Sequence, residues 1–292
     1  RDFMKRISKG LFYLVFFLGI IFGFASCSKS SFVLVEGTSF RGQIADSEIF
    51  VDGRPIKINS FFICNHEVTQ DEYKKVMAEN PSYFASNAAV NEEQKQRPVE
   101  CVSFYDAIAY CNKLSMMEGL NPCYKINGSY KPADWGLIPN MYNETWNSVT
   151  CDFSANGYRL PTEVEWEYAA RGGKKFIGDG TRQYLYAGGN DIGEVAWYVE
   201  NSDGKTHEVL EKDSNQLDIY DMSGNVAEWC WDWFSEITAE TPVTGATSSS
   251  SKTSRGGNWG ERAFSNQVNS RSNENPAFKS YGLGFRVVRT AK

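Results

Sequence analysis

The amino-acid sequence predicts an α+β fold in which helices come early and short, irregular strands come late. Apolar residues recur at helical spacing in three segments that all precede Gly173, whereas beyond it short strand-like runs alternate with Gly, Asn and Ser turns. The chain has 292 residues, of which 41% are hydrophobic and 14% aromatic, enough for one sizeable core or at most two small domains. Its 25 glycines and 8 tryptophans favour a loop-rich fold with large buried rings.

The predicted domain opens with two strands and a capped helix. Residues 32–37 are predicted to form a first strand, which stops at a glycine. The apolar residues 61–63 are predicted to form a second strand. Thr69 is an N-cap candidate because apolar residues follow it at helical spacing. Asn80 and Pro81 are expected to end this helix.

Two further helices are predicted downstream. Ser103 begins one whose apolar face ends before Gly119. Thr162 caps the next, and Glu165 lies three residues on as its capping-box partner. Beyond that helix no long helical period appears, residues 238–254 form a Thr/Ser-rich loop, and no internal repeat is evident.

Residues 1–27 are typical of a processing signal rather than of the fold. A basic n-region precedes the apolar run 11–24, and small residues lead from it to Cys27. A membrane-spanning helix needs roughly 20 apolar residues, and this run is shorter. The arrangement resembles a bacterial lipoprotein signal, which predicts cleavage before Cys27 and lipidation of that thiol. An uncleaved signal anchor is the alternative.

Either form of anchor predicts a membrane-bound protein that faces away from the cytoplasm. With a lipid anchor on Cys27, residues 28–31 are a short tether and residues 32–292 form the folded domain. The predicted location is the cell surface, at the outer membrane. The inner membrane is the alternative.

The charge of the chain excludes one class of partner and its cysteines leave a question open. The net charge is −6 and no Lys/Arg-rich stretch occurs, which argues against nucleic acid. Six cysteines follow Cys27, none in a CxxC spacing, so free buried thiols and disulfides both remain possible. Zinc is disfavoured because His66 and His207 are the only histidines and neither lies near a cysteine pair.

Six segments, in order along the chain, resemble the formylglycine-generating-enzyme-like (sulfatase-modifying factor) family. They are HEVT at 66–69, RPV at 97–99, NGYRLPTEVEWEYAARGG at 156–173, GNVAEW at 224–229, RGGNW at 255–259 and GFR at 284–286. The resemblance implies the C-type-lectin fold of the formylglycine-generating-enzyme subtype across the predicted domain.

The residues that carry the family's oxidase chemistry are absent. In the oxidases two cysteines follow the RGG segment and bind copper, and a thiolate pair suits soft Cu(I). Here the matching positions hold Glu261 and Asn266, and no cysteine follows Cys230. An iron-dependent oxygenase would need a histidine-rich site, which two isolated histidines do not supply. We therefore expect no catalytic residue and no catalytic cofactor, and the calcium-dependent sugar-binding signatures of lectins are also missing.

The resemblance also implies a structural calcium ion. The matching segment offers side-chain oxygens from Asp221 and Glu228 and carbonyl oxygens from Gly224 and Val226. Two carboxylates with carbonyl oxygens suit a hard cation. The alternative is that Asp221 and Glu228 are ordinary hydrogen-bonding residues.

The segment 255–289 resembles the variable region of proteins diversified by retroelements, which use the same lectin-type fold. Residues suited to packing, such as Trp259 and Phe285, alternate there with residues that follow no periodic pattern. By this resemblance, twelve positions are candidate ligand-binding residues: Gly260, Glu261, Arg262, Phe264, Ser265, Ser270, Ser272, Glu274, Phe278, Ser280, Tyr281 and Gly282. The aromatic residues among them supply rigid contact area and the serines supply hydrogen bonds, as in a paratope. A plain surface loop without a ligand is the alternative.

Three function classes follow from these observations. The first is a non-catalytic display lipoprotein that binds a protein or another cell-surface ligand through the diversified segment. The second is an accessory envelope lipoprotein without diversified binding, and the third is an enzyme of the family with altered chemistry. No feature of the sequence favours a symmetric interface, so a monomer is expected.

Overall fold

The computed structural model describes residues 31–44, 46–174 and 184–291. The predicted signal peptide, the lipidation site Cys27 and all of the tether but Ser31 lie outside the described residues. Within the described part of the chain, no helix is both long and apolar enough to cross a membrane.

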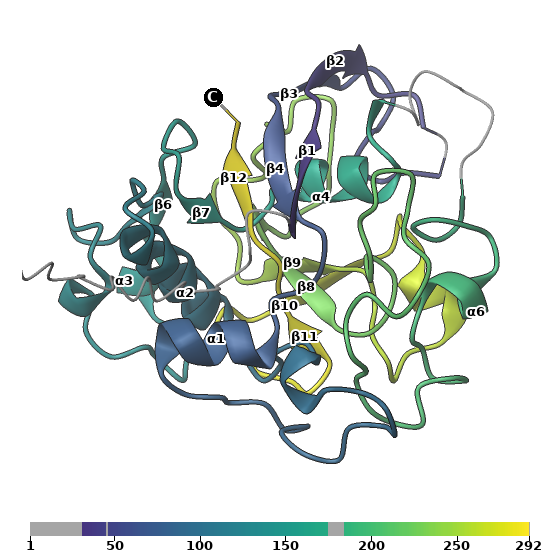
Figure 1. Ribbon diagram of the computed structural model, residues 1–292. Helices are drawn as coiled ribbons and strands as arrows, with labels where there is room; N and C mark the ends of the chain where they lie inside the picture. The colour runs from purple at the N-terminus through teal and green to yellow at the C-terminus, as the bar shows by residue number, and fades with distance from the viewer. Residues whose placement is uncertain (1–30, 45, 175–183, 292) are drawn as a thin grey trace, which may run out of the picture.

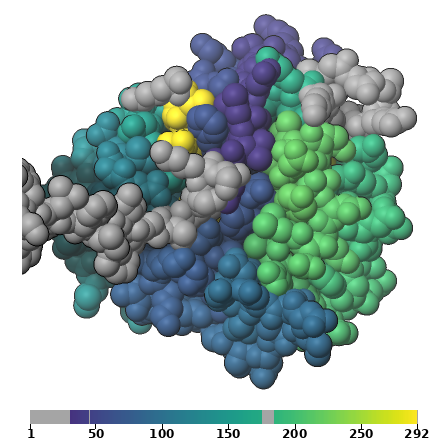
Figure 2. Space-filling model, viewed as in Figure 1, coloured from purple at the N-terminus to yellow at the C-terminus, as the bar shows by residue number. Residues whose placement is uncertain are grey.

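One four-stranded sheet joins the two ends of the domain. Its order is β1-β4-β12-β7, where the strands are Phe32–Val35, Phe61–Cys64, Val288–Thr290 and Tyr158–Arg159. The pairs β1–β4, β4–β12 and β12–β7 are all antiparallel, so the last strand lies between strands from the first third and the middle of the chain (Figure 1). Figure 2 shows the yellow β12 at the surface beside the purple and blue N-terminal strands.

The second four-stranded sheet carries the C-terminal segment. Its order is β10-β9-β8-β11, with strands Arg271–Glu274, Lys252–Arg255, Ala227–Trp233 and Leu283–Gly284. The pair β8–β11 is parallel and the other two pairs are antiparallel. Two small ribbons complete the strands: β2–β3 (Thr38–Arg41 with Pro55–Ile58) and β5–β6 (Tyr124–Lys125 with Thr150–Cys151).

Capping boxes begin the three main helices. Helices α1 (Gln70–Met77), α2 (Phe104–Met117) and α4 (Glu163–Ala170) follow Thr69, Ser103 and Thr162, and at each start the cap side chain and the N3 carboxylate bond each other's backbone N–H. The predicted starts of all three helices are therefore confirmed. Shorter helices and turns lie elsewhere: α3 (Glu144–Asn147), α6 (Ile192–Val195), η2 (Gln94–Gln96), η3 (Pro132–Asp134) and η4 (Ala263–Asn266).

The Thr162→Ala variant is expected to lower the free energy of unfolding by about 0.5–2 kcal/mol. The Thr162 hydroxyl accepts a bond of 3.2 Å from the Glu165 backbone N–H, and alanine leaves that donor without its cap. Chemical denaturation measures the loss. Thr162→Ser is the control, because serine keeps the hydroxyl, and an equal loss in both variants would contradict the capping role.

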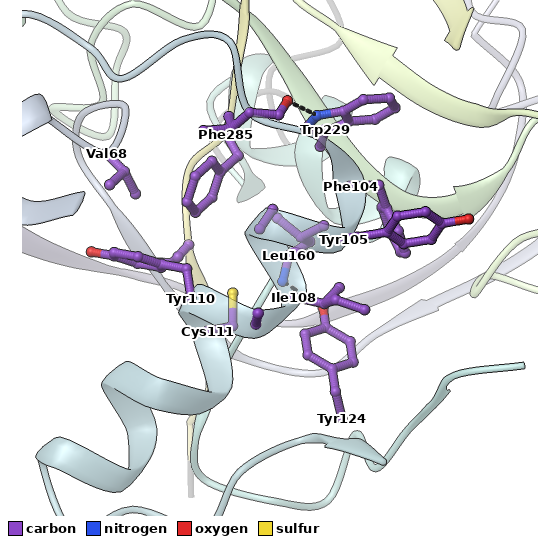
Figure 3. Close-up of a cluster of buried hydrophobic side chains, with 14 of the residues drawn as sticks. Val68, Phe104, Tyr105, Ile108, Tyr110, Cys111, Tyr124, Leu160, Trp229 and Phe285 are labelled. Atoms are coloured by element: carbon purple, nitrogen blue, oxygen red, sulfur yellow. Dashed lines mark hydrogen bonds between the residues drawn. The ribbon is translucent and has the colours of Figure 1, made fainter. Parts of the chain in front are cut away.

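Two buried clusters of hydrophobic side chains fill the domain. In the first, Phe285 from the C-terminal segment packs edge-on against Tyr110 of α2, with ring centroids 5.2 Å apart (Figure 3). Trp229 of β8 packs against Phe104 and donates its indole N–H to the Val102 carbonyl at 3.0 Å. Trp166 of α4 anchors the second cluster with no exposed surface. The expected large buried rings are thus present.

The structure corrects two of the predicted boundaries and adds two ribbons. Helix α1 ends at the left-handed Ala78, before Asn80. The predicted loop 238–254 is wrong at its C-terminal end, because β9 begins at Lys252. This lysine is buried, and its ammonium group lies 3.9 Å from the centre of the Trp233 ring. The β2–β3 and β5–β6 ribbons were not predicted.

Candidate functional site

A hollow in the surface lies over the β10-β9-β8-β11 sheet and has a volume of about 210 Å³. Three separate parts of the C-terminal segment enclose it, namely the turn after β9, strand β10 and the loop before β11. Its lining residues are Ala227, Ser254, Arg255, Gly256, Gly257, Asn258, Glu261, Ser265, Ser270, Ser272, Glu274, Phe278, Ser280, Gly282 and Leu283.

The structure brings most of the twelve candidate ligand-binding residues together. Eight of them line the hollow: Glu261, Ser265, Ser270, Ser272, Glu274, Phe278, Ser280 and Gly282. The other four, Gly260, Arg262, Phe264 and Tyr281, are exposed outside its lining. Gly282 alone among the twelve is buried, and a Cβ there would lie 2.8 Å from the Asn258 side chain, so this position has less room for substitution than the others.

An aromatic patch stands beside the hollow. The Tyr281 ring, 52% exposed, lies 5.8 Å from the ring of Trp259 and 5.6 Å from the ring of Tyr83, which is 70% exposed. Phe84 packs edge-on against Trp259 at 5.3 Å. Tyr83 and Phe84 were not predicted at this surface, because no local pattern marks them and only the fold brings them to Tyr281.

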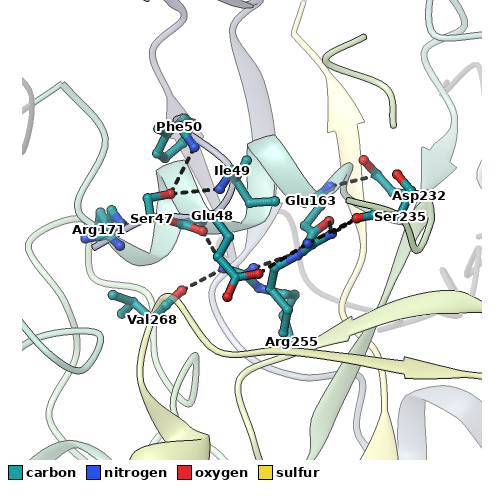
Figure 4. A network of polar contacts seen from close by, with 12 residues as sticks. Ser47, Glu48, Ile49, Phe50, Glu163, Arg171, Asp232, Ser235, Arg255 and Val268 are labelled. Atoms are coloured by element: carbon teal, nitrogen blue, oxygen red, sulfur yellow. Dashed lines mark hydrogen bonds and ion pairs between the residues drawn. The ribbon is translucent and has the colours of Figure 1, made fainter. Parts of the chain in front are cut away.

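A buried ion network supports the hollow from below. Arg255 of β9 donates to Glu163 at 2.9 Å and to Glu167 at 2.6 Å, both on α4 (Figure 4). Arg271 of β10 donates to both carboxylate oxygens of Glu163, at 2.6 and 3.0 Å. The network therefore fixes two adjacent strands of the floor, β9 and β10, to one helix, and the carboxylates of that helix already bind both guanidinium groups.

A second set of hydrogen bonds holds the turn that carries Glu261. The Asn266 side-chain amide donates to the backbone oxygen of Arg262 at 2.9 Å and to that of Glu261 at 3.4 Å. Asn266 has no exposed surface. The buried Asn266 thus holds the turn between the first candidate residues from inside.

The predicted calcium ligands fit a cation poorly. Arg286 donates to both oxygens of the Glu228 carboxylate, at 2.6–2.9 Å, and the Trp166 indole N–H donates to it at 2.7 Å. A guanidinium group therefore already compensates this carboxylate. In the described part of the chain, no group of three or more His, Cys, Asp or Glu side chains could hold a metal ion.

Protein groups also hold the loop around the other predicted ligands. Glu67, from the segment 66–69, accepts from the Val226 backbone N–H at 2.9 Å and from the Asn225 side chain at 2.8 Å. Burial, followed by the charges of Asp221 and Glu228, raises the pKa of Glu67 well above its usual value. Burial also raises the pKa of Asp221 to about 6, and one of its oxygens lacks a hydrogen-bond partner. Calcium binding stays a prediction, and Glu228 is the residue that fits it least.

We expect the melting temperature to be the same in excess EDTA and in millimolar calcium. A ligand that binds only the native state raises the stability of that state. Because Arg286 already compensates the charge of Glu228, we expect calcium to add no stability. Differential scanning calorimetry measures this directly. A higher melting temperature with calcium, but not with magnesium, would restore Asp221 and Glu228 as a cation site.

Burial lowers the reactivity of five of the six described cysteines, because it raises the pKa of Cys101, Cys111, Cys123, Cys151 and Cys230. No disulfide joins the described cysteines, and the two that are not buried, Cys101 and Cys151, are partly covered. Burial raises the pKa of Cys101 to about 12 and that of Cys123 to about 11. Since the thiolate is the reactive form, these side chains are poor nucleophiles and poor metal ligands.

Thiol labelling tests this state of the cysteines. At mildly alkaline pH the native protein is expected to react with Ellman's reagent far more slowly than the same protein in denaturant, where all six described thiols should react. A total below six in denaturant would reveal a disulfide. A fast thiol in the native protein would contradict the protection by burial.

Comparison with known proteins gives one family, and two of the relatives match this chain over nearly their full length. The profile of the sulfatase-modifying factor enzyme 1-like domain matches residues 23–291. The chaperone protein LppX of Paenibacillus barcinonensis is 37% identical over 311 residues, covering 95% of this chain and 99% of that protein. The solved structure of Treponema denticola variable protein 1 is 36% identical with a TM-score of 0.80, covering 89% of this chain and 95% of that one.

The enzymes of this family match over a shorter stretch. The formylglycine-generating enzyme of Streptomyces coelicolor is 34% identical over 168 residues, about half of each chain. Together these likenesses confirm the predicted α+β fold of the formylglycine-generating-enzyme, C-type-lectin type, and the resemblance to a retroelement variable protein.

Proposed function

Since this chain belongs to the sulfatase-modifying factor enzyme 1-like family, we propose that it is a member without catalytic activity that binds a partner through its C-terminal hollow. The binding surface comprises the hollow and the exposed aromatic residues beside it. Diversification by a retroelement changes the side chains of this surface. A lipid on Cys27 anchors the protein at the outer, cell-surface side of the membrane.

One observation carries this proposal. The candidate residues share one surface, and the residues beneath them form a framework that does not depend on them. Of the twelve candidates only Gly282 is buried, whereas Arg255 has no exposed side-chain surface and Arg271 only 4%. Exposed substitutions usually change stability by less than about 0.5 kcal/mol. Such a framework tolerates repeated change of the surface above it.

The two alternative functions make different predictions about the residues of the hollow. An oxidase of the family needs the thiolate pair, and here Glu261 lines the hollow while Asn266 is buried beneath the turn and bonded to it. An accessory lipoprotein is favoured by the full-length likeness to a protein named a chaperone. Such a protein would keep the same side chains at this surface in all isolates. Isolates that differ at the candidate residues would therefore favour a diversified binding protein over an accessory lipoprotein.

A peptide selection tests the proposed binding surface. Phage-displayed random peptides are selected on the full chain and then measured against the variant Phe264→Ser/Phe278→Ser/Tyr281→Ser. These side chains are 66%, 44% and 52% exposed, so we expect weaker peptide binding with little change in melting temperature.

The matched control is Val90→Ser/Leu137→Ser, which removes two side chains of 91% and 94% exposure outside the hollow. It should keep both peptide binding and melting temperature. Equal loss of binding in the control, or a large fall of the melting temperature in the test variant, would contradict the proposal.

A further inference from the structure

Two of the acceptor groups that line the hollow carry negative charge, and neither has a cationic partner in the described part of the chain. Two carboxylates, Glu261 and Glu274, line it together with five serines. Arg255 is its only basic lining residue, and the guanidinium group of Arg255 is bound by Glu163 and Glu167 below the floor. The nearby Lys279 is paired with Asp106 at 2.7 Å.

The two carboxylates come from different elements. Glu261 lies in the turn after β9, where the side chains of Asn258 and Ser265 bond to it. Glu274 ends strand β10. Both side chains line the same hollow. Burial raises the pKa of both carboxyl groups, and the charge of Glu261 raises the pKa of Glu274 further. Neither pKa is lowered by a lysine or arginine.

A third acceptor lies directly behind the lining. The Oδ1 atom of Asn266 is buried and has no hydrogen-bond partner. It lies against Gly257, which lines the hollow, since a Cβ on that glycine would be 2.6 Å from it. A buried acceptor of this kind is normally paired. The hollow therefore offers acceptors to a ligand that brings hydrogen-bond donors and positive charge.

We propose that the hollow receives a basic side chain, arginine or lysine, from a protein partner, held between the carboxylates of Glu261 and Glu274. This inference rests on the proposed function. It states which kind of ligand group the variable side chains of this chain would bind. A guanidinium or ammonium group supplies several donors, and bonds between ions are stronger than neutral ones. Phe278, at the rim and 44% exposed, offers a ring for the cation or its methylenes.

The volume and the charge of the hollow agree with this occupant. About 210 Å³ holds several waters or one long side chain, but no folded element. The rim residues remain free to contact the rest of the partner. A basic side chain thus acts as an anchor, and the aromatic patch contributes area around it.

The test uses single amino-acid probes on the full chain. N-acetyl-arginine amide, N-acetyl-lysine amide and the neutral N-acetyl-citrulline amide are titrated separately, and the backbone amide signals of Gly257, Ser265 and Ser280 are followed by NMR. We expect saturable shifts at these three residues with either basic probe, and weak or no shifts with citrulline. The basic probe that binds more tightly identifies the preferred side chain.

Two variants connect binding to the carboxylates. Glu261→Gln/Glu274→Gln keeps size and hydrogen bonding but removes both charges, and should weaken the basic probes about tenfold or more. Glu211→Gln/Glu240→Gln removes the same net charge from exposed positions outside the hollow and should bind as the wild type.

The outcomes separate this inference from the proposed function. Equal binding of citrulline and arginine, unchanged affinity in Glu261→Gln/Glu274→Gln, or shifts that map outside the hollow would each overturn the basic-side-chain inference. In those cases the peptide selection still decides the proposed function, because peptides without a basic residue that bind at the hollow would uphold it. Selected peptides that share an arginine or lysine support both.

Discussion

The Arg286→Ala variant is expected to lose about 3–5 kcal/mol of folding free energy, because removing one partner of a buried ion pair strands the other. Arg286 has no exposed surface and binds both oxygens of Glu228. It also donates to the backbone oxygens of Cys64 at 3.1 Å and Tyr220 at 2.9 Å. One side chain thus joins strand β4, strand β8 and the loop before β8.

Urea denaturation of Arg286→Ala measures this loss. Arg262→Ala is the matched control, since Arg262 is exposed and should change stability by less than about 0.5 kcal/mol. If Arg286→Ala unfolded at the wild-type urea concentration, the guanidinium group would not be what compensates Glu228. A cation at the predicted calcium position would then regain support.

The Glu163→Ala variant is expected to lose a similar amount, about 3–5 kcal/mol, because it leaves two buried arginines with one carboxylate fewer. Glu163 is 1% exposed and accepts from Arg255 at 2.9 Å and from Arg271 at 2.6 Å. These arginines fix β9 and β10, the floor of the hollow. Binding of selected peptides should therefore fall together with stability.

Glu48 provides the control within the same network. Its side chain is 72% exposed and lies 3.5 Å from Arg271, and exposed pairs of this kind contribute about 0–1 kcal/mol. Glu48→Ala should thus keep both stability and peptide binding. Equal losses in Glu48→Ala and Glu163→Ala would show that the buried network is not what supports the floor.

The helices were predictable because their signals are local. Thr69, Ser103 and Thr162 each stand three residues before an acidic partner, and both members of the capping box lie within one turn. The two-residue strands β7 and β11 were not predictable, because they have no period of their own. They exist only through pairing with distant segments, as in the parallel pairing of β11 with β8.

The candidate site was predictable in its membership but not in its shape. The resemblance to variable proteins supplied the twelve positions, eight of which line one hollow. The sequence does not show that Glu261 and Glu274 line the same hollow. It also does not show that Tyr83 stands beside Tyr281, since the fold alone brings them together.

The calcium prediction, which stays a prediction, rests on residue types alone. The sequence places two carboxylates and two carbonyl groups at the matching positions, which satisfies the chemistry of a hard cation. It does not show that Arg286 reaches Glu228. A family ligand can keep its residue type while its charge is compensated by another side chain.

Sequencing codons 255–289 and the neighbouring locus in independent isolates tests the central claim most directly. A diversified binding surface predicts a near-copy of the segment beside a reverse transcriptase gene, with differences at the twelve candidate codons that coincide with adenines of the copy. The buried framework residues Arg255, Asn266 and Arg271 should stay constant. Identical segments without a second copy, or differences that fall equally on the framework, would contradict the claim.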